Sequence, residues 1–355
     1  MEMNRRDLIR AAVAAALAPA AAGLGLASPR EARAAVNCDS PINVIMPPDY
    51  TPPLEGDAAS DYQARLARAT LDFVRESYGA RNLPVWGKPL TQVDLDKRVN
   101  NIAYWILDGV RRAREVYPVD PAWVMGQIMA ESFFDEFAVS FAFAVGVCQF
   151  IAPTARGFGM LTAGDRDEHG RLPHKLPEFA GEIRRYYVAR EKWKTALRAR
   201  RGLIPDEGEL LLAALKALAS GGKLAKAKEY VAAMDKEGAL SRQVQEARKN
   251  FKAFLEANFA GRDIFDENDL NFLRQFDERV TYSKPIRAMV LMLAKNLKAR
   301  SGNIVAAAAG YNAGLASTAD DNPVYERYGR IPGFEETVGY VSRLFINHHE
   351  ILRRM

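Results

Sequence analysis

The sequence predicts an all-α protein, and three observations support this fold class. Apolar residues recur at steps of three and four along most of the chain, which is the spacing of one face of an α-helix. Several of these segments begin at a capping residue or end at a glycine. The sequence has no run of alternating β-branched residues, so a sizeable sheet is not expected. With 355 residues, 48% hydrophobic and 26% charged, the composition is that of an ordinary globular protein of one or two domains.

Residues 1–34 are predicted to be an export signal that is cleaved off. Arg5-Arg6 precedes an Ala-rich stretch, and Ala32-Arg33-Ala34 matches the small-x-small pattern of a cleavage site. This arrangement is typical of a twin-arginine signal, but Asn4 and Leu8 differ from the residues usual at their positions, which leaves the general secretion route open. The stretch is too weakly apolar for a spanning helix, so we expect a periplasmic mature chain without a transmembrane segment.

Residues 35–60 are predicted to be an extended linker, because they contain five prolines and show little periodicity. Cys38 lies in this segment, whereas Cys148, the other cysteine, lies in an apolar run. We therefore expect Cys148 to be a buried free thiol and not half of a disulfide. The residues before Cys38 do not fit a lipoprotein signal, so lipidation is not expected.

Residues 61–160 are predicted to contain three helices followed by a segment of turns. The first helix covers residues 61–78 and the second covers residues 99–117. Asp120-Pro121 starts the third, because aspartate accepts hydrogen bonds from first-turn amides and proline needs no amide partner at the first helical position. This third helix is expected to continue to about Phe134.

Glu131 lies on the apolar face of the third helix. Val124, Ile128 and Glu131 follow one another at steps of four and three, so the acid shares a face with core residues. Burying an unpaired charge is costly, so this carboxyl must be hydrogen-bonded, paired or protonated. The neighbouring Asp135 and Glu136 are interpreted as solvated or capping residues.

Residues 161–280 are predicted to form an inserted helical subdomain, because they are charged and lack the glycine-containing apolar turns of the preceding segment. The basic residues between Arg184 and Arg201 are interpreted as a solvated helix face, with contact to an anionic polymer or lipid head groups as the alternative. Residues 281–355 return to the main domain. Helices are expected at residues 178–200, 209–219, 224–234, 243–259 and 269–276 of the insertion, and afterwards at residues 285–298, 303–311 and 333–353.

Three motifs flank this insertion. The first motif has four parts: Glu131-Ser132, Ala138-Val139-Ser140, residues 144–149 and Pro153-Thr154-Ala155. The second motif is Ala-Gly-Tyr-Asn-Ala-Gly at residues 309–314. The third motif is Glu-Thr-Val-Gly-Tyr-Val at residues 336–341. In this order and spacing they resemble the lytic transglycosylases with an Slt-type, lysozyme-like domain. The resemblance covers about residues 99–160 and 284–350 and does not extend to the insertion.

The resemblance implies a lysozyme-like fold and an enzyme that cleaves the β-1,4 bond between N-acetylmuramic acid and N-acetylglucosamine in peptidoglycan, leaving 1,6-anhydromuramyl ends. Glu131 would be the only acid and base, with Tyr311 as its hydrogen-bond partner. Peptidoglycan glycan strands are the expected substrate, and the insertion is a candidate surface for other cell-wall proteins. The family positions that line the sugar cleft or hold the catalytic acid correspond to Ser140, Gln149, Tyr311, Asn312 and Tyr340.

The sequence departs from the family pattern at three positions. Phe143 stands where the family usually has glycine, and Cys148 and Ile151 stand where methionine is common. Phe143 is expected to narrow or reshape the cleft. Tyr311 and Tyr340 have a structural alternative as core aromatics with satisfied hydroxyls. Two other functions stay open: a goose-type lysozyme-like hydrolase, in which water attacks, and a catalytically weak peptidoglycan-binding or assembly factor.

Other chemistries have less support. The net charge of +5 suits an anionic partner, but the export signal argues against nucleic acid. The sequence contains neither a phosphate-binding glycine loop nor a G-x-S-x-G elbow. No metal or cofactor is expected, because the histidines lack metal-type spacing and are interpreted as surface or capping residues. These histidines are His169, His174, His348 and His349.

Overall fold

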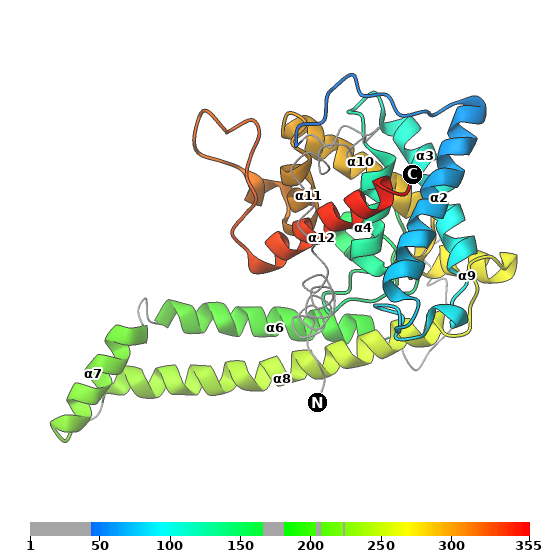
Figure 1. The fold of residues 1–355 in the computed structure, drawn as a ribbon. Helices are drawn as coiled ribbons and strands as arrows, with labels where there is room; N and C mark the ends of the chain where they lie inside the picture. The colour runs from blue at the N-terminus through cyan, green and yellow to red at the C-terminus, as the bar shows by residue number, and fades with distance from the viewer. Residues whose placement is uncertain (1–43, 166–180, 204–206, 223) are drawn as a thin grey trace. The chain divides into compact units, whose positions relative to one another are not determined.

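The protein is all-α in the computed structural model (Figure 1). Strand pairing in the part of the chain that the structure describes is limited to isolated bridges. The described residues are 44–165, 181–203, 207–222 and 224–355. The predicted signal, the first nine residues of the predicted linker with Cys38, and two of the histidines, His169 and His174, lie outside these ranges.

The chain divides into two compact units. The first unit is formed by the chain up to Thr162 together with the chain from Asp277 onward, and the second unit spans Ala163–Phe276. The second unit thus falls within residues 161–280, the range that the sequence predicts to be an insertion.

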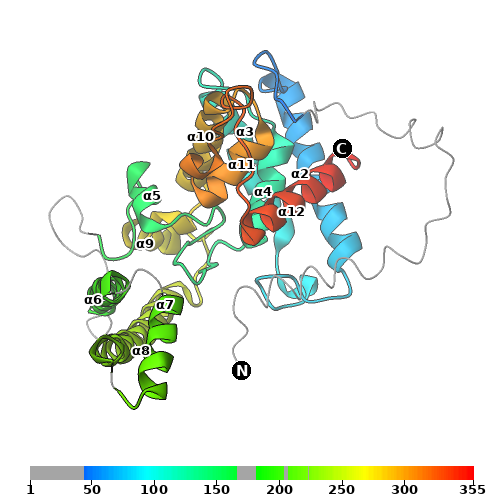
Figure 2. The ribbon, with the colours of Figure 1, turned by 90° about the vertical axis from the view of Figure 1, so that its left-hand side faces the viewer.

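The first unit is built around α4 (Pro121–Ser132), whose residues from Pro121 to Met129 are all buried. Helix α4 packs against α3 and α12, and α3 also packs against α2 and α10 (Figures 1 and 2). The helices are α2 (Gly56–Tyr78), α3 (Leu95–Ala113), α5 (Ala152–Gly157), α10 (Ser283–Ala299), α11 (Ile304–Ala313) and α12 (Glu335–Leu352), with short 3₁₀ turns η1 (Leu90–Gln92), η2 (Glu278–Val280) and η3 (Leu315–Thr318).

The start of α4 is fixed by its cap. Asp120 accepts a hydrogen bond from the Ala122 amide (2.9 Å), as the sequence predicts. Its other carboxyl oxygen lies 2.7 Å from Nε2 of His348 in α12. His348 is therefore buried and bonded, so its interpretation as a surface or capping residue was wrong. The backbones of α4 and α12 approach closely at Gly126, where a Cβ would lie 3.2 Å from the amide nitrogen of His348.

The second unit is a helical hairpin in which α6 (Glu182–Leu203) and α8 (Ala225–Phe259) lie side by side (Figures 1 and 2). Helix α7 (Glu207–Ala219) joins them, and α9 (Glu267–Phe276) follows. The predicted pair of helices at 224–234 and 243–259 is one continuous helix, because the residues between them are helix formers apart from Gly238, which a long helix tolerates. Aromatic rings form the core of this unit at Tyr186, Phe251, Phe254 and Phe276.

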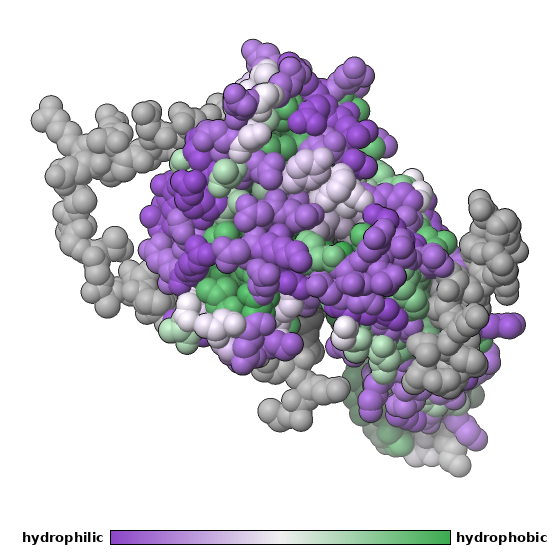
Figure 3. All heavy atoms as spheres, turned by 90° about the vertical axis from the view of Figure 1, so that its right-hand side faces the viewer, coloured by the Kyte–Doolittle hydropathy of each residue, from purple (hydrophilic) through white to green (hydrophobic). Residues whose placement is uncertain are grey.

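The face of the molecule in Figure 3 is mostly hydrophilic, with small hydrophobic areas between the charged side chains. None of the helices in the described ranges is long and apolar enough to cross a membrane.

Candidate active site

Glu131 is half-buried in the last turn of α4. The next residue, Ser132, is buried and donates its hydroxyl to the carbonyl of Ile128 (3.2 Å) and to that of Val147 (3.0 Å). The helix then ends two residues earlier than predicted, because Phe133 (φ 51°) and Phe134 (φ 66°) both adopt the left-handed conformation. Two such non-glycine residues in succession turn the chain sharply directly after Ser132, so Glu131 lies in the final turn of a buried helix and is itself half-buried.

The segment after this turn, residues 138–150, folds into a compact loop. Gln149 donates its amide nitrogen to the carbonyls of Ala138 (3.1 Å) and Gly146 (2.9 Å). The hydroxyl of Ser140 accepts a hydrogen bond from the Ala144 amide (3.0 Å). Both predicted cleft residues are thus bonded to the backbone of their own loop, and they determine its shape.

A buried arginine that lies outside residues 138–150 in the sequence binds the backbone of this loop. Arg279 is 2% exposed, forms an ion pair with Asp277 (Nη2 to Oδ2, 2.6 Å) and donates Nη1 to the carbonyls of Phe143 (2.9 Å) and Phe150 (3.0 Å). The loop backbone meets Arg279 at Gly146 (φ 81°), where a Cβ would lie 1.9 Å from the Arg279 carbonyl oxygen. Neither Arg279 nor Asp277 was predicted from the sequence, although the three successive charged residues at 277–279 between two apolar residues were a possible signal.

Phe143 has a left-handed backbone (φ 59°) and a side chain that is 6% exposed. This conformation explains why glycine would suit the position. The ring is buried, so it fills the inside of the loop instead of standing open in a cleft.

Tyr311, on α11, contacts the same loop although it lies more than 150 residues later in the sequence. Its hydroxyl donates to the Cys148 carbonyl (2.7 Å), and its ring lies 5.8 Å from that of Phe150. The hydroxyl proton is thus used by the Cys148 carbonyl and is not available to a Glu131 carboxylate. The predicted hydrogen bond between Tyr311 and Glu131 stays a prediction, in which the Tyr311 oxygen would accept from a protonated Glu131. Burial raises the pKa of the Tyr311 hydroxyl well above its ordinary value, and Cys148, Glu131 and Tyr340 add to this effect.

Tyr340, on α12, lies between Glu131 and Gln127 and is 2% exposed. Burial raises the pKa of its hydroxyl well above the ordinary value, Glu131 raises it further by charge and hydrogen bonding, and hydrogen bonding to Gln127 lowers it in part. No contact of this hydroxyl with a described residue reaches full hydrogen-bond geometry. Tyr340 is therefore within reach of both groups without a tight bond to either.

Two further groups enclose the carboxyl of Glu131. Cys148 is a fully buried free thiol, as predicted, and burial followed by the charge of Glu131 raises its pKa well above the ordinary value. Gln127 lies one helical turn before Glu131 and is 0% exposed, and neither atom of its amide makes a hydrogen bond of full geometry with a described residue, although Tyr340 lies near it. Gln127 was not predicted as a site residue, because it belongs to none of the three motifs. A polar residue among the apolar residues of α4 could have indicated its role.

Asn312 connects the second and third motifs. Its side-chain oxygen accepts a hydrogen bond from the Thr337 hydroxyl (2.9 Å) in α12, one turn before Tyr340. The side-chain nitrogen of Asn312 donates no hydrogen bond to another of the described residues.

The two carboxyls after Glu131 have different environments. Glu136 is 0% exposed and paired with Arg98 (Oε1 to Nη2, 2.6 Å), and it accepts a hydrogen bond from Tyr282 (3.2 Å), so its interpretation as solvated or capping was wrong. Asp135 is half-buried and accepts a hydrogen bond from the Phe137 amide (2.8 Å), which is a turn contact and not a helix cap.

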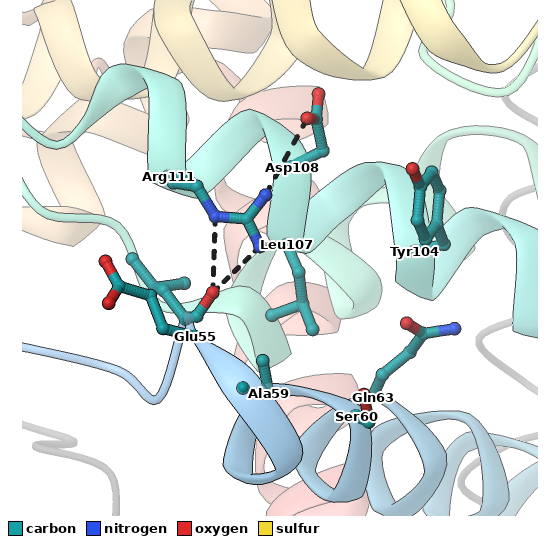
Figure 4. A pocket seen from close by; sticks show the side chains of 10 residues that line it. Glu55, Ala59, Ser60, Gln63, Tyr104, Leu107, Asp108 and Arg111 are labelled. Atoms are coloured by element: carbon teal, nitrogen blue, oxygen red, sulfur yellow. Dashed lines mark hydrogen bonds and ion pairs between the residues drawn. The ribbon is translucent and has the colours of Figure 1, made fainter.

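A pocket of about 360 Å³ lies elsewhere in the first unit, between the start of α2 and α3 (Figure 4). Arg111 closes one side by donating to the Leu54 carbonyl (3.2 and 2.8 Å), and Tyr104 and Gln63 stand on the other. None of the predicted site residues lines it.

Comparisons with protein-family models, with curated proteins and with solved structures found no match to this chain. The fold and site define an all-α protein in which one carboxyl at a helix end is surrounded by two tyrosines, a thiol and an amide. In the described part of the chain, no group of three or more His, Cys, Asp or Glu side chains is placed to hold a metal ion.

Proposed function

We propose that the protein is an exported, periplasmic lytic transglycosylase with a lysozyme-like domain. It would cleave the β-1,4 bond between N-acetylmuramic acid and N-acetylglucosamine in peptidoglycan and leave a 1,6-anhydromuramyl end. Glu131 would carry out both proton transfers.

The main support is that residues of all three motifs meet at Glu131. Tyr311 from the second motif bonds to Cys148 of the first (2.7 Å), and Tyr340 from the third lies within reach of Glu131. Tyr311 and Tyr340 are more than 150 residues from Glu131 in the sequence, so a core without a functional constraint would not require these particular side chains to converge there.

In the proposed reaction Glu131 first donates its proton to the glycosidic oxygen while the bond from that oxygen to C1 of the muramyl residue breaks. The resulting carboxylate then accepts the proton of the muramyl C6 hydroxyl as its oxygen bonds to C1. Glu131 is protonated again at the end, so no water is consumed. Between the two steps the Tyr340 hydroxyl can donate a hydrogen bond to the carboxylate and keep its own proton, and the side-chain amide of Asn312 can donate a hydrogen bond to a sugar oxygen.

The decisive test is digestion of purified peptidoglycan, with mass spectrometry of the products. Wild-type protein should release 1,6-anhydromuramyl fragments, and Glu131→Gln should reduce turnover by about 10²- to 10⁴-fold, the usual contribution of a positioned acid. Binding to insoluble peptidoglycan should be largely retained. The matched control is Glu335→Gln, which removes an exposed carboxyl at the start of α12 and should leave turnover unchanged.

Two outcomes would contradict the proposal. Products with reducing ends would indicate a goose-type hydrolase, in which water attacks C1. Binding without turnover by the wild-type protein would indicate a peptidoglycan-binding or assembly factor.

A further inference from the structure

Helix α7 lies at the end of the α6–α8 hairpin (Figures 1 and 2). One of its faces is apolar and exposed. Residues 208–219 include none that is buried. Four leucines are more than half exposed: Leu211 (61%), Leu212 (54%), Leu215 (54%) and Leu218 (70%). Leu211, Leu215 and Leu218 follow at steps of four and three, so they lie on one face of the helix, with Leu212 beside them. We call these four residues the leucine face.

The leucine face has no evident structural role in the second unit. The core of that unit is formed mainly by aromatic residues of α6, α8 and α9. Helix α7 contacts α8, and its half-buried residues, Leu210, Ala214 and Ala217, lie on a different face from the exposed leucines. Single exposed leucines are ordinary, but several on one helix form a patch of the kind that marks a protein or membrane contact.

Exposed cations occur on α7 and at the ends of α6 and α8 that are nearest to α7 in the sequence. Lys216 lies on α7 itself, Lys226 and Lys228 lie in the first turn of α8, and Arg198 and Arg201 lie near the end of α6; all five are exposed. Residues 198–229 contain seven Lys or Arg against four Asp or Glu, a net charge of +3. An apolar helix face with cations at its border is the arrangement that binds the surface of an anionic bilayer.

We propose that α7 docks on an anionic lipid bilayer, with the leucine face at the boundary of the acyl chains and the exposed lysines and arginines at the phosphate groups. A second copy of the chain is a poorer occupant, because it would bring two sets of the same cations together. The proposal does not depend on the enzymatic activity, since it concerns only the second unit.

The test uses the full chain and vesicles of equal parts phosphatidylglycerol and phosphatidylcholine, compared with pure phosphatidylcholine. An environment-sensitive dye is attached through Leu212→Cys in a Cys38→Ser background, where Cys148 is buried and unreactive. The dye should shift to the blue with the anionic vesicles and much less with the neutral ones. Because the dye reports on α7 alone, membrane contacts made by residues 1–34 do not affect it.

The variant Leu211→Ser with Leu215→Ser, in the same labelled chain, should weaken partitioning at least tenfold, because it removes two large apolar side chains from the contact. The matched control is Val324→Ser with Ile346→Ser, which changes two side chains of similar exposure in the first unit (69% and 55%) and should have no effect. Circular dichroism should be unchanged for both variants, since none of these side chains is buried.

Two results would overturn the proposal. One is the absence of a blue shift with anionic vesicles. The other is a blue shift without vesicles that grows with protein concentration and disappears in the Leu211→Ser, Leu215→Ser variant, which would show that a second copy covers the leucine face.

Discussion

The carboxyl of Asp135 titrates in an unusual range. Burial raises its pKa to about 6; the hydrogen bond from the Phe137 amide lowers it, the charge of Glu136 raises it, and Arg98 and Lys88 lower it. In the unfolded chain the pKa returns to an ordinary value near 3.8. The folded protein therefore holds this proton more tightly, so this group makes stability fall as the pH rises from about 4 to about 6 and has a constant effect above that range.

Asp135→Asn should remove this pH dependence. Asparagine can still accept the hydrogen bond from the Phe137 amide, and it has no charge to bury. The difference of about two pKa units corresponds to at most about 3 kcal/mol, so the variant should be more stable than wild type at pH 8 by up to this amount and similar at pH 4. Urea unfolding at both pH values measures the effect. A variant that is less stable than wild type at pH 8 would contradict it, and Asp57→Asn, on the surface of α2, is the control.

At the scale of elements, the loop of residues 138–150 depends on Arg279. Arg279→Met should destabilise the protein by about 3 to 5 kcal/mol, because Asp277 would remain buried without its partner and the carbonyls of Phe143 and Phe150 would lose a donor. Denaturant unfolding measures this loss. Arg274→Met, at an exposed arginine of α9, should change stability by less than about 0.5 kcal/mol.

The double variant Asp277→Leu with Arg279→Met separates charge from packing. It should be less destabilised than Arg279→Met alone, since it leaves no unpaired buried charge. An equal or greater loss in the double variant would mean that the ion pair is not the reason for the effect.

The helices were predictable wherever a periodic apolar face coincided with a local start signal. Asp120-Pro121 gave the start of α4 correctly because capping is a short-range effect. The end of α4 was placed two residues late, since nothing in the sequence indicates that Phe133 and Phe134 turn left-handed. Helix α3 begins at Leu95, four residues before the predicted start, because the cap at Asp94, which accepts from the Lys97 amide (3.1 Å), was not recognised.

Only those residues of the candidate site that belong to a sequence motif were predictable. Comparison of motifs pointed to Glu131, Tyr311 and Tyr340, and these residues come together in the fold. Gln127 and Arg279 were not found, because their roles depend on contacts across the core that no local pattern encodes. The hydrogen bond from Tyr311 to the Cys148 carbonyl was also not predicted, since it depends on the path of the backbone at Cys148.

At the scale of the whole molecule, the first unit is assembled from two separated stretches of sequence whose ends meet where the second unit begins and ends. The Glu278 amide donates to the Leu161 carbonyl (2.9 Å), and the Leu161 amide donates to the carboxylate of Glu278 (2.6 Å). These two bonds lie within the first unit and hold the junction closed. The contact of Tyr311 with Cys148 and the approach of Tyr340 to Glu131 also lie within this unit.

Replacing residues 163–276 by a short Gly-Ser linker should therefore leave a chain that folds by itself. The linker joins two points that are already close, so the entropic cost of closing it is small. The shortened protein should unfold in a single cooperative transition by circular dichroism, and on purified peptidoglycan it should keep any Glu131-dependent turnover of the full chain. Arg279→Met in the shortened chain should cost the same stability as in the full chain, because the bonds of Arg279 stay within the first unit. If the shortened chain shows no cooperative transition, the first unit needs the second unit in order to fold. If the shortened chain folds but does not turn over peptidoglycan, although the full chain does, the second unit takes part in binding the substrate.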